Sequence, residues 1–402
     1  MTGNGPLSGL LVVDLSRALA GPHATMMMGD LGARVVKVEI PERGDDTRGW
    51  GPPFRWPESA GDPEGGDVGG RESTYFLSAN RNKESIVIDL KQESERGVLL
   101  GLIRQADVLV ENFRTGVLDR LGLGVERLHQ VNPRLVILSI TGFGHDGPEG
   151  GRSGYDQVVQ GEAGLMSLTG PSPDEPQKVG TPIADLLAGM YGAFGVVAAL
   201  RERDRTGAGS VVRTSLLSAV VGVHGFQGTR WTVAGEVGRA QGNHHSAIAP
   251  YGLFQCRDGA VQIAVGSEKL WREFCAGFGL DPARPPFGTN GDRAANLDTL
   301  VPYIEEVFSR WSAAELLDRL TAIGIPAGRV RSIDEVYDWE QTRSQGLLVD
   351  VEHATLGRLE LPGPPLRFFD VEGAEVTPRS HTPPPVLDQH GAAIRAAIEG
   401  QG

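Results

Sequence analysis

The sequence predicts an α/β protein with a Rossmann-like large domain built on a parallel sheet, and a smaller α+β domain. Two observations indicate this class. Continuous apolar segments rich in Val, Ile and Leu alternate with helical patterns along the first half of the chain, as in parallel sheets covered on both faces. The chain also has 402 residues, more than one hydrophobic core usually supports, so two domains are expected.

The first half of the chain repeats the order of strand, helix and strand. β-rich segments are expected around 11–16, 34–40, 84–90, 106–112 and 134–140, with helices around 20–33, 96–105 and 117–130. A longer helix headed by Asp185 extends to about Arg203. The polar, glycine-rich segment RDRTGAGS follows it and predicts a domain boundary.

The second half reads as a smaller unit followed by a return to the large domain. Short strands are expected in APYGLFQC and AVQIAV, with helices around EKLWREFCAGF and TLVPYIEEVFSRWSAAELLDRLTAIG. LLVDVEHATLGRLELPGPPLRF alternates like a hairpin, and a proline-rich segment precedes a last short helix. The predicted division is 1–205 for the large domain, 225–325 for the small domain and 330–402 for a C-terminal part.

Composition excludes several classes of function. The net charge is -13 and the arginines are dispersed, so a nucleic-acid partner is not expected. Cys256 and Cys275 are the only cysteines and lack metal-ligand spacing with His, so neither a disulfide scaffold nor a metal site is expected. No predicted helix opens with a G-x-G-x-x-G or Walker sequence. The N-terminus lacks a targeting pattern and no apolar stretch is expected to span a membrane, so the protein is predicted to be cytoplasmic.

A single acid stands at the head of the apolar stretch GTPIADLLAGMYGAFG, residues 180 to 195. Asp185 in the first turn of a helix could simply cap backbone N–H groups and match the helix dipole. The small residues around it, Gly180, Ala184, Ala188 and Gly189, leave room for another backbone or for a ligand. Capping does not require that room, so both interpretations stay open from this stretch alone.

The ordered combination of several blocks resembles the class III CoA-transferase (CaiB/BaiF-like) family. The resemblance extends over about residues 10 to 390 and is carried by ALAGPHATMMMGDLGARVVKVEIPERGDDTRGW, NRNKESIVIDLK, ADVLVENFRTGVLDRLGLG, NPRLVILSITGFG, GYDQVVQGEAGLMSLTG, PIADLLAGM, GIPAGRV and LGRLELPGPPLRF. It implies that the C-terminal part completes a large CoA-binding domain around an inserted small domain. It also implies an interlocked homodimer, CoA esters and carboxylic acids as substrates, and no tightly bound cofactor.

The same resemblance makes Asp185 the expected nucleophile. Family transferases use the acid in the block matching PIADLLAGM to attack an acyl-CoA thioester, which gives a mixed anhydride of comparable reactivity and then an aspartyl-CoA thioester. The N-terminus of the helix is expected to keep Asp185 ionised. The small residues are expected to make space for the pantetheine thiol.

Four residues match the family positions that hold the adenosine and phosphate end of CoA: Lys91, Asn112, Phe113 and Arg120. Arg and Lys suit phosphates, and Phe113 can pack on adenine. Without the resemblance, these would be a strand-end polar residue, a core aromatic and two solvated charges. Ile40 stands where some members have Arg, and Arg43 is a nearby substitute. Other residues in blocks that approach the active site in relatives are Arg17, Arg48, Trp50 and Tyr75.

The segment GNHHSAIAPY resembles the branch that includes succinyl-CoA:glutarate (hydroxymethylglutarate) CoA-transferase, which moves CoA between dicarboxylates. Gly242 and His245 belong to this pattern, which lacks the run of glycines that formyl-CoA transferases use to shield the anhydride. The distal carboxylate of a dicarboxylate needs a cationic or hydrogen-bonding seat, for which Arg17 and His245 are candidates.

Two alternative functions are weighed against CoA transfer. The racemase branch of the superfamily exchanges the α-proton of 2-methylacyl-CoA and carries Gly-His-Asp where this chain has Gly154, Tyr155 and Asp156. Tyr is a poor replacement for a His base, and His145 reads as a surface loop residue. A non-catalytic CoA-binding protein would be expected to have lost Asp185 or the CoA-facing residues, and these are present.

Overall fold

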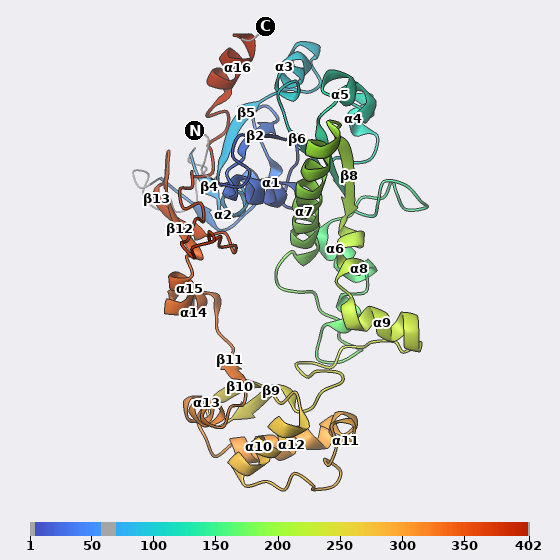
Figure 1. Cartoon of the computed structure of the whole chain (residues 1–402), viewed down its shortest axis with the longest axis vertical. Coiled ribbons are helices and arrows are strands. Elements are labelled where there is room, and N and C mark those ends of the chain that lie inside the picture. The colour runs from blue at the N-terminus through green and yellow to red at the C-terminus, as the bar shows by residue number, and fades with distance from the viewer. Residues whose placement is uncertain (1–4, 58–69, 401–402) are drawn as a thin grey trace. The chain divides into compact units, whose positions relative to one another are not determined.

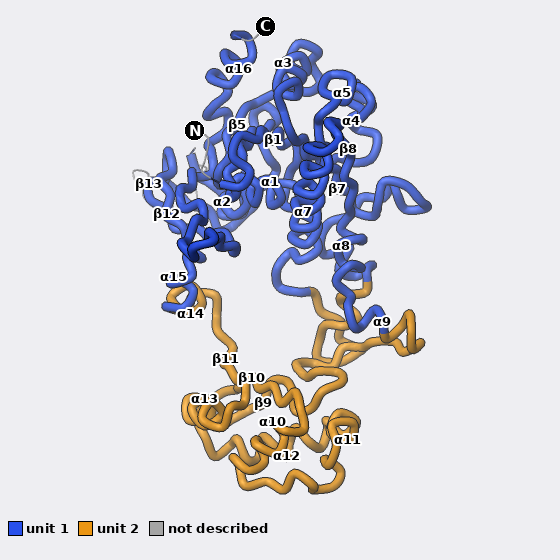
Figure 2. The backbone as a smooth tube through the Cα atoms, in the orientation of Figure 1, with its two compact units in different colours: residues 1–163, 179–229, 340–402 blue, residues 164–178, 230–339 orange. Residues whose placement is uncertain are grey.

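The computed structural model describes residues 5–57 and 70–400, which form two compact units (Figure 2). Unit 1 comprises the described parts of Met1–Ala163, Val179–Thr229 and Glu340–Gly402. Unit 2 comprises Gly164–Lys178 and Arg230–Trp339. The first boundary was predicted at residue 205, whereas unit 1 continues to Thr229 and the chain first enters unit 2 at Gly164.

Unit 1 contains the predicted parallel sheet, which is confirmed and has six strands in the order β5-β2-β1-β6-β7-β8 (Figure 1). The strands are β1 (Leu11–Asp14), β2 (Arg34–Glu39), β5 (Lys83–Val87), β6 (Val108–Glu111), β7 (Val136–Thr141) and β8 (Ser210–Ser215). β8 was not predicted. It follows the segment that the sequence indicated as a linker. In the structure, Gly207 of that segment ends the preceding helix at φ +80°, and the chain then pairs with β7.

Helices cover both faces of this sheet, and alternate side chains of the strands point to opposite faces. Ile137 of β7 shares a core with α3 (Glu93–Ile103), α5 (Val125–Val131) and α16 (Gly391–Glu399). Leu138, the next residue, approaches Gly192 of α7 (Ile183–Thr206) on the other face, where α1 (Ala20–Asp30) also packs. This two-sided burial explains the continuous apolar strands in the sequence.

The helix predicted over 117–130 is two helices, α4 (Val117–Arg120) and α5. Gly122 between them has φ +71°, a left-handed conformation that interrupts a helix, and Gly124 is the N-cap of α5 in an extended conformation. The apolar pattern continues across the break because both helices pack on the same core.

Unit 2 contains a three-stranded antiparallel sheet in the order β11-β10-β9, with helices packed on its core. The elements are β9 (Tyr251–Cys256), β10 (Gly259–Ala264), β11 (Ala327–Arg329), α10 (Glu268–Phe278), α12 (Leu297–Phe308) and α13 (Ala313–Ala322). Trp271, Phe274 and Phe308 are among the buried aromatic residues of this core.

The predicted C-terminal hairpin is present as β12 (Leu348–His353) and β13 (Gly357–Pro362), which pair antiparallel. The remaining elements are η1 (Asp46–Gly49), β3 (Phe54–Arg55), β4 (Glu72–Ser73), α2 (Thr74–Ser78), α6 (Asp156–Glu162), η3 (Met166–Leu168), α8 (Leu216–Gly222), α9 (Gly225–Ala234), α11 (Asn290–Ala295), α14 (Ile333–Asp338) and α15 (Glu340–Ser344).

Helix α7 is long and apolar. By length and composition alone it could cross a membrane, although no membrane-spanning stretch was expected from the sequence. In unit 1 it packs against α1, α8, β7 and β8. Its apolar character therefore matches the contacts of a helix laid on a sheet.

Candidate active site

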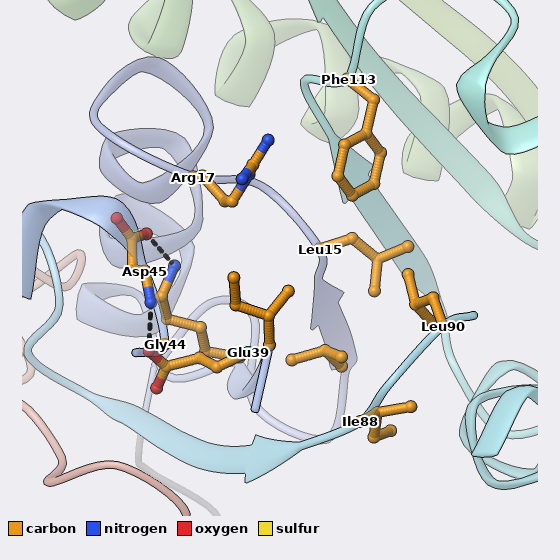
Figure 3. A pocket seen from close by; sticks show the side chains of 11 residues that line it. Leu15, Arg17, Glu39, Gly44, Asp45, Ile88, Leu90 and Phe113 are labelled. Atoms are coloured by element: carbon orange, nitrogen blue, oxygen red, sulfur yellow. Dashed lines mark hydrogen bonds and ion pairs between the residues drawn. The ribbon is translucent and has the colours of Figure 1, made fainter. Parts of the chain in front are cut away.

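A pocket lies in unit 1 at the carboxyl ends of the strands, where ligands bind in open parallel sheets (Figure 3). The space between its lining residues is about 340 Å³ when the open solvent at its mouth is included. Leu15, Ile88, Leu90 and Phe113 form an apolar side, and Glu39, Gly44 and Asp45 form the opposite side. An apolar wall facing a few polar groups suits a flat ring with hydrogen-bonding edges.

The turn after β1 forms part of this pocket and has an unusual backbone. Ala18 has φ +64°, which a residue with a Cβ rarely adopts. The Ala18 N–H donates to Asp45 Oδ1 at 3.2 Å. The amide of Asn112 holds the preceding residue from both sides, since its Oδ1 accepts from Arg17 N at 2.8 Å and its Nδ2 donates to Arg17 O at 2.7 Å. These contacts stabilise a conformation that would otherwise be strained.

Buried ion pairs support the same turn from below. Lys37 Nζ lies 2.8 Å from Asp45 Oδ2 and donates to the Ser16 carbonyl at 3.0 Å. Burial opposes the charge of Asp45, but Lys37 and the hydrogen bonds from Thr47 outweigh it and lower the pKa of Asp45 to about 2. Lys83 Nζ lies 3.1 Å from Asp14 Oδ2, and its burial lowers its pKa to about 8. Pairing allows these charges to stay buried.

Asp185 is the third residue of α7 and is half-buried. Burial first, and then the negative charge of Asp156, raises the pKa of Asp185 from 3.8 to about 7. The N-terminus of the helix was expected to keep this carboxylate ionised, whereas with a pKa of about 7 it is only partly ionised near neutral pH. Desolvation and a second acid outweigh the helix dipole here.

Tyr75 lies within electrostatic reach of this carboxylate, and Trp50 packs against Tyr75. Trp50 and Tyr75 pack edge to face with ring centroids 5.0 Å apart. Burial and the charges of Asp185, Asp156 and Asp45 raise the pKa of Tyr75 to about 12. Tyr75 therefore keeps its phenolic proton, and it is close enough to both Asp45 in the pocket and Asp185 on α7 to sense their charges.

The small residues of α7 serve helix packing. Ala184 and Ala188 are fully buried, and a Cβ at Gly189 would lie 2.6 Å from the Ala20 carbonyl oxygen of α1. The room that the sequence assigned to a pantetheine thiol is thus filled at Gly189 by the backbone of α1. This packing places the start of α1, just after the Arg17–Ala18 turn, against the second turn of α7.

The predicted CoA residues are distributed unevenly around the pocket. Phe113 lines it, and so does Arg17, which was predicted as a substrate seat; the Arg17 guanidinium carbon lies 5.7 Å from the centre of the Phe113 ring. Lys91 is exposed and directly follows the lining residue Leu90, and Arg120 is exposed at the end of α4. Arg43 is exposed beside Gly44, and Ile40 also lines the pocket.

Gly242 and His245, the predicted substrate residues, lie in unit 2. Gly242 has φ +61° and its N–H donates to Gly170 O at 2.9 Å. The His245 ring stacks on Tyr251 with centroids 5.2 Å apart, and its Nδ1 accepts from Ala247 N at 3.0 Å. In unit 2 these residues shape a loop and the start of β9.

Tyr155 and His145, the residues considered for the racemase alternative, are not arranged as a pair of bases with Asp185. Tyr155 is 71% exposed. His145 is half-buried, and its Nε2 lies 2.7 Å from Ser139 Oγ, which in turn donates to Glu111. Burial lowers the pKa of His145, and nothing in this arrangement pairs it with Asp185 as a second base. The geometry does not favour the racemase alternative.

One group near Asp185 was not selected from the sequence. Asp156, the first residue of α6, accepts hydrogen bonds from the backbone of Ala184 and Asp185. In the sequence, Asp156 stood out only as part of Gly154-Tyr155-Asp156, which was compared with the Gly-His-Asp of racemases. A side chain that caps a helix 28 residues away gives no local pattern.

The fold and the site together define an α/β enzyme that presents a half-buried carboxyl group and a pocket at the carboxyl edge of its sheet. The comparisons with known proteins specify it further. Residues 7–391 match the model of CoA-transferase family III. The chain belongs to this family and is a CoA-transferase.

Three similar proteins support this assignment. The chain is 37% identical to a succinate–glutarate CoA-transferase of Agrobacterium fabrum, covering 98% of this chain and 96% of that protein. It is 36% identical to an acetyl-CoA:oxalate CoA-transferase of Acetobacter aceti, covering 97% and 95%. A solved structure of a CaiB/BaiF family protein from Brucella suis has a TM-score of 0.84 and 38% identity, covering 98% and 100%.

Proposed function

We propose that this CoA-transferase moves CoA between dicarboxylic acids and uses Asp185 as its covalent nucleophile. The observation that carries the proposal is the Asp185 carboxyl group, half-buried at the start of α7 with a pKa raised to about 7. A more basic carboxylate is a stronger nucleophile, and at neutral pH a large fraction of it is still ionised. The substrates named for both relatives above are dicarboxylates or their CoA esters, apart from acetyl-CoA.

The first half of the reaction loads CoA onto the enzyme. An Asp185 oxygen attacks the thioester carbonyl carbon, the C–S bond breaks, and CoA leaves as its thiolate. The product is a mixed anhydride. The thiolate then attacks Cγ of Asp185, the anhydride C–O bond breaks, and the donor acid leaves as a carboxylate, which leaves an aspartyl-CoA thioester.

The second half reverses these steps with another acid. The acceptor carboxylate attacks Cγ, CoA leaves again as the thiolate, and a second anhydride forms. The thiolate attacks the acceptor acyl carbon and releases the Asp185 carboxylate with the new CoA ester. No redox step and no net proton transfer is needed. Tyr75, which keeps its proton, is proposed to donate a hydrogen bond to the oxyanion of a tetrahedral intermediate.

The pocket at the carboxyl edge is proposed to hold the adenosine part of CoA. Its apolar side, with Phe113, matches a purine ring, and exposed Lys91 and Arg120 can reach phosphates without losing a buried partner. Asn112 contributes through the Arg17 turn, because both ends of its amide already bond to that backbone.

Arg17 is the proposed seat for the second carboxylate of the substrate. Its guanidinium pairs with Asp46 at 3.2 Å, and both side chains are partly exposed. An exposed ion pair of this kind contributes little, about 0–1 kcal/mol, so a substrate carboxylate can replace Asp46 at low cost. Gly242 and His245 are proposed to contact the acceptor, on the strength of the GNHHSAIAPY resemblance alone.

We also propose a cytoplasmic homodimer in which unit 2 is the inserted small domain. The exposed face of α7 presents Met190, Tyr191, Phe194 and Val197, and Phe194 is 74% exposed. An apolar stripe of this kind on a soluble chain marks an association surface. The interlocked arrangement follows from the family resemblance.

Two measurements test the proposal. Hydroxylamine added during turnover should label Asp185, which lies in the tryptic peptide 179–201, and Asp185→Ala should lower transfer at least ~10³-fold. A panel with succinyl-CoA as donor should show faster transfer to glutarate, methyl-substituted succinates, itaconate or hydroxymethylglutarate than to oxalate, carnitine or monocarboxylates. An unlabelled Asp185 would overturn the mechanism, and a preference for carnitine would overturn the substrate class alone.

A further inference from the structure

Helix α6 holds the chain that leads into α7 at several points. Asp156 Oδ1 accepts from Ala184 N at 2.7 Å and from Asp185 N at 3.3 Å. Asp156 Oδ2 accepts from Gln160 Nε2 at 2.7 Å. Gln160, one turn further along α6 and fully buried, accepts from Val179 N at 2.9 Å through its Oε1. Two side chains of one short helix thus fix the segment 179–185 at both ends.

Helix α7 lacks a cap of its own. Its N-cap residue is Pro182, which has no side-chain acceptor, and the first N–H groups of a helix have no partner within the helix. Asp156 supplies the missing acceptor from another helix. Because the first turn is held by its backbone, the direction of the Asp185 Cα–Cβ bond is held with it.

The charge of Asp156 acts on the same residue. Its carboxylate opposes ionisation of Asp185, in addition to the effect of burial. Among the other titratable groups packed around the start of α7, Tyr75 of α2 stays protonated. His23 of α1 is neutral at neutral pH, because burial lowers its pKa to about 4. Asp156 is therefore the charged neighbour that tunes this site.

We propose that Asp156 is a positioning residue for CoA transfer, which caps α7 to aim Asp185, while Gln160 fixes the approaching segment. The proposal rests on Asp185 being the nucleophile. Asp156 itself makes no bond to substrate. Its two effects can be separated, because Asn keeps the Oδ1 acceptor for the α7 backbone and removes the charge, losing only the bond from Gln160 Nε2. Ala removes both acceptors and the charge.

The test compares Asp156→Asn, Asp156→Ala and Gln160→Ala with the control Gln157→Ala, an exposed neighbour on α6. Single-turnover formation of the aspartyl-CoA thioester is measured from pH 5 to 9. Asp156→Asn should keep the maximal rate within about 3-fold and move the acidic limb of the profile down by about 1 pH unit or more. Asp156→Ala should lower the maximal rate at least ~10-fold, and Gln160→Ala should lower it less.

Peptide mapping separates this proposal from the one it rests on. Asp156 lies in the tryptic peptide 153–178 and Asp185 in 179–201, so hydroxylamine labels report on each acid independently. No label on 179–201 in the wild type would refute Asp185 as nucleophile. A label on 153–178 would show that Asp156 reacts and would overturn the positioning role. With Asp185 labelled, an unmoved acidic limb in Asp156→Asn or a wild-type rate in Asp156→Ala would also overturn it.

Discussion

Replacing Asp185 by Asn should stabilise the protein above neutral pH while it abolishes transfer. The folded state raises the pKa of Asp185 from 3.8 to about 7 through burial and through Asp156. The folded state therefore binds this proton more tightly than the unfolded state does. The contribution of Asp185 to stability is complete below about pH 4 and is lost as the pH rises through about 7. Asn has nearly the same shape and never ionises.

The size of the effect follows from the two values. The interval from 3.8 to about 7, at 1.36 kcal/mol per pH unit, corresponds to an upper bound of about 4 kcal/mol. Because Asp185 is only half-buried, solvent screens part of this cost, and about 1–3 kcal/mol is expected at pH 8. At pH 5 most of the folded protein already carries the proton, and the gain should be less than half as large.

The assay is thermal unfolding of both proteins at pH 5, 6, 7 and 8 at one ionic strength. The variant should have a Tm higher by roughly 1–4 °C at pH 8, with a smaller difference at pH 5. Asp298→Asn is the matched control, since Asp298 is an exposed acid in the first turn of α12. It should show the same small difference at every pH. A Tm difference for Asp185→Asn that does not grow between pH 5 and 8 would refute the reasoning.

Three further predictions concern the pocket and the packing behind it. Neutral substitutions of Lys91 and Arg120 should raise the KM for acyl-CoA, because each removes a charge-assisted contact that contributes about 1–3 kcal/mol of binding free energy, and kcat should change less. An unchanged KM in both variants would contradict the phosphate role. Asn112→Ala removes both bonds to the Arg17 backbone, so the KM should rise about 10-fold, and unchanged kinetics would show that the turn holds without it. Gly189→Ala should destabilise the protein by about 1–3 kcal/mol in thermal or denaturant unfolding, because its Cβ would lie 2.6 Å from the Ala20 carbonyl. Gly97→Ala in α3, with no atom within 4 Å of the new Cβ, should be neutral or slightly stabilising, and equal effects at the two positions would contradict the packing argument.

The strands and main helices were predictable because their signals are local. A buried parallel strand needs apolar residues on both faces, so its segment is continuous in sequence, as in β2 and β7. β8 escaped prediction because the glycine-rich RDRTGAGS before it has the composition of a linker, whereas the structure uses Gly207 only to end α7. The break between α4 and α5 depends on a positive φ at Gly122, which composition does not reveal.

Residue type and order are enough to select candidate site residues, whereas the effects of charges distant in the sequence leave no such signal. Phe113 and Arg17 were selected and do line the pocket. The raised pKa of Asp185 was not anticipated, because the helix dipole is visible in the sequence while burial and the contact with Asp156 are not. Asp156 reaches α7 only after the chain has passed through unit 2 between α6 and α7. No local sequence pattern therefore predicts the contact between Asp156 and α7.

The two hydrogen bonds between the Asn112 amide and the Arg17 backbone also affect how such sequences are compared. An amide whose oxygen and nitrogen both bond to the backbone of one residue reports the shape of a turn, not the chemistry of a ligand. A motif search that selects Asn at this position would therefore collect chains that build the same bend after their first strand, including chains that bind something other than CoA. The next residue, Phe113, lines the pocket, and the proposal about the ligand depends on this residue and not on Asn112.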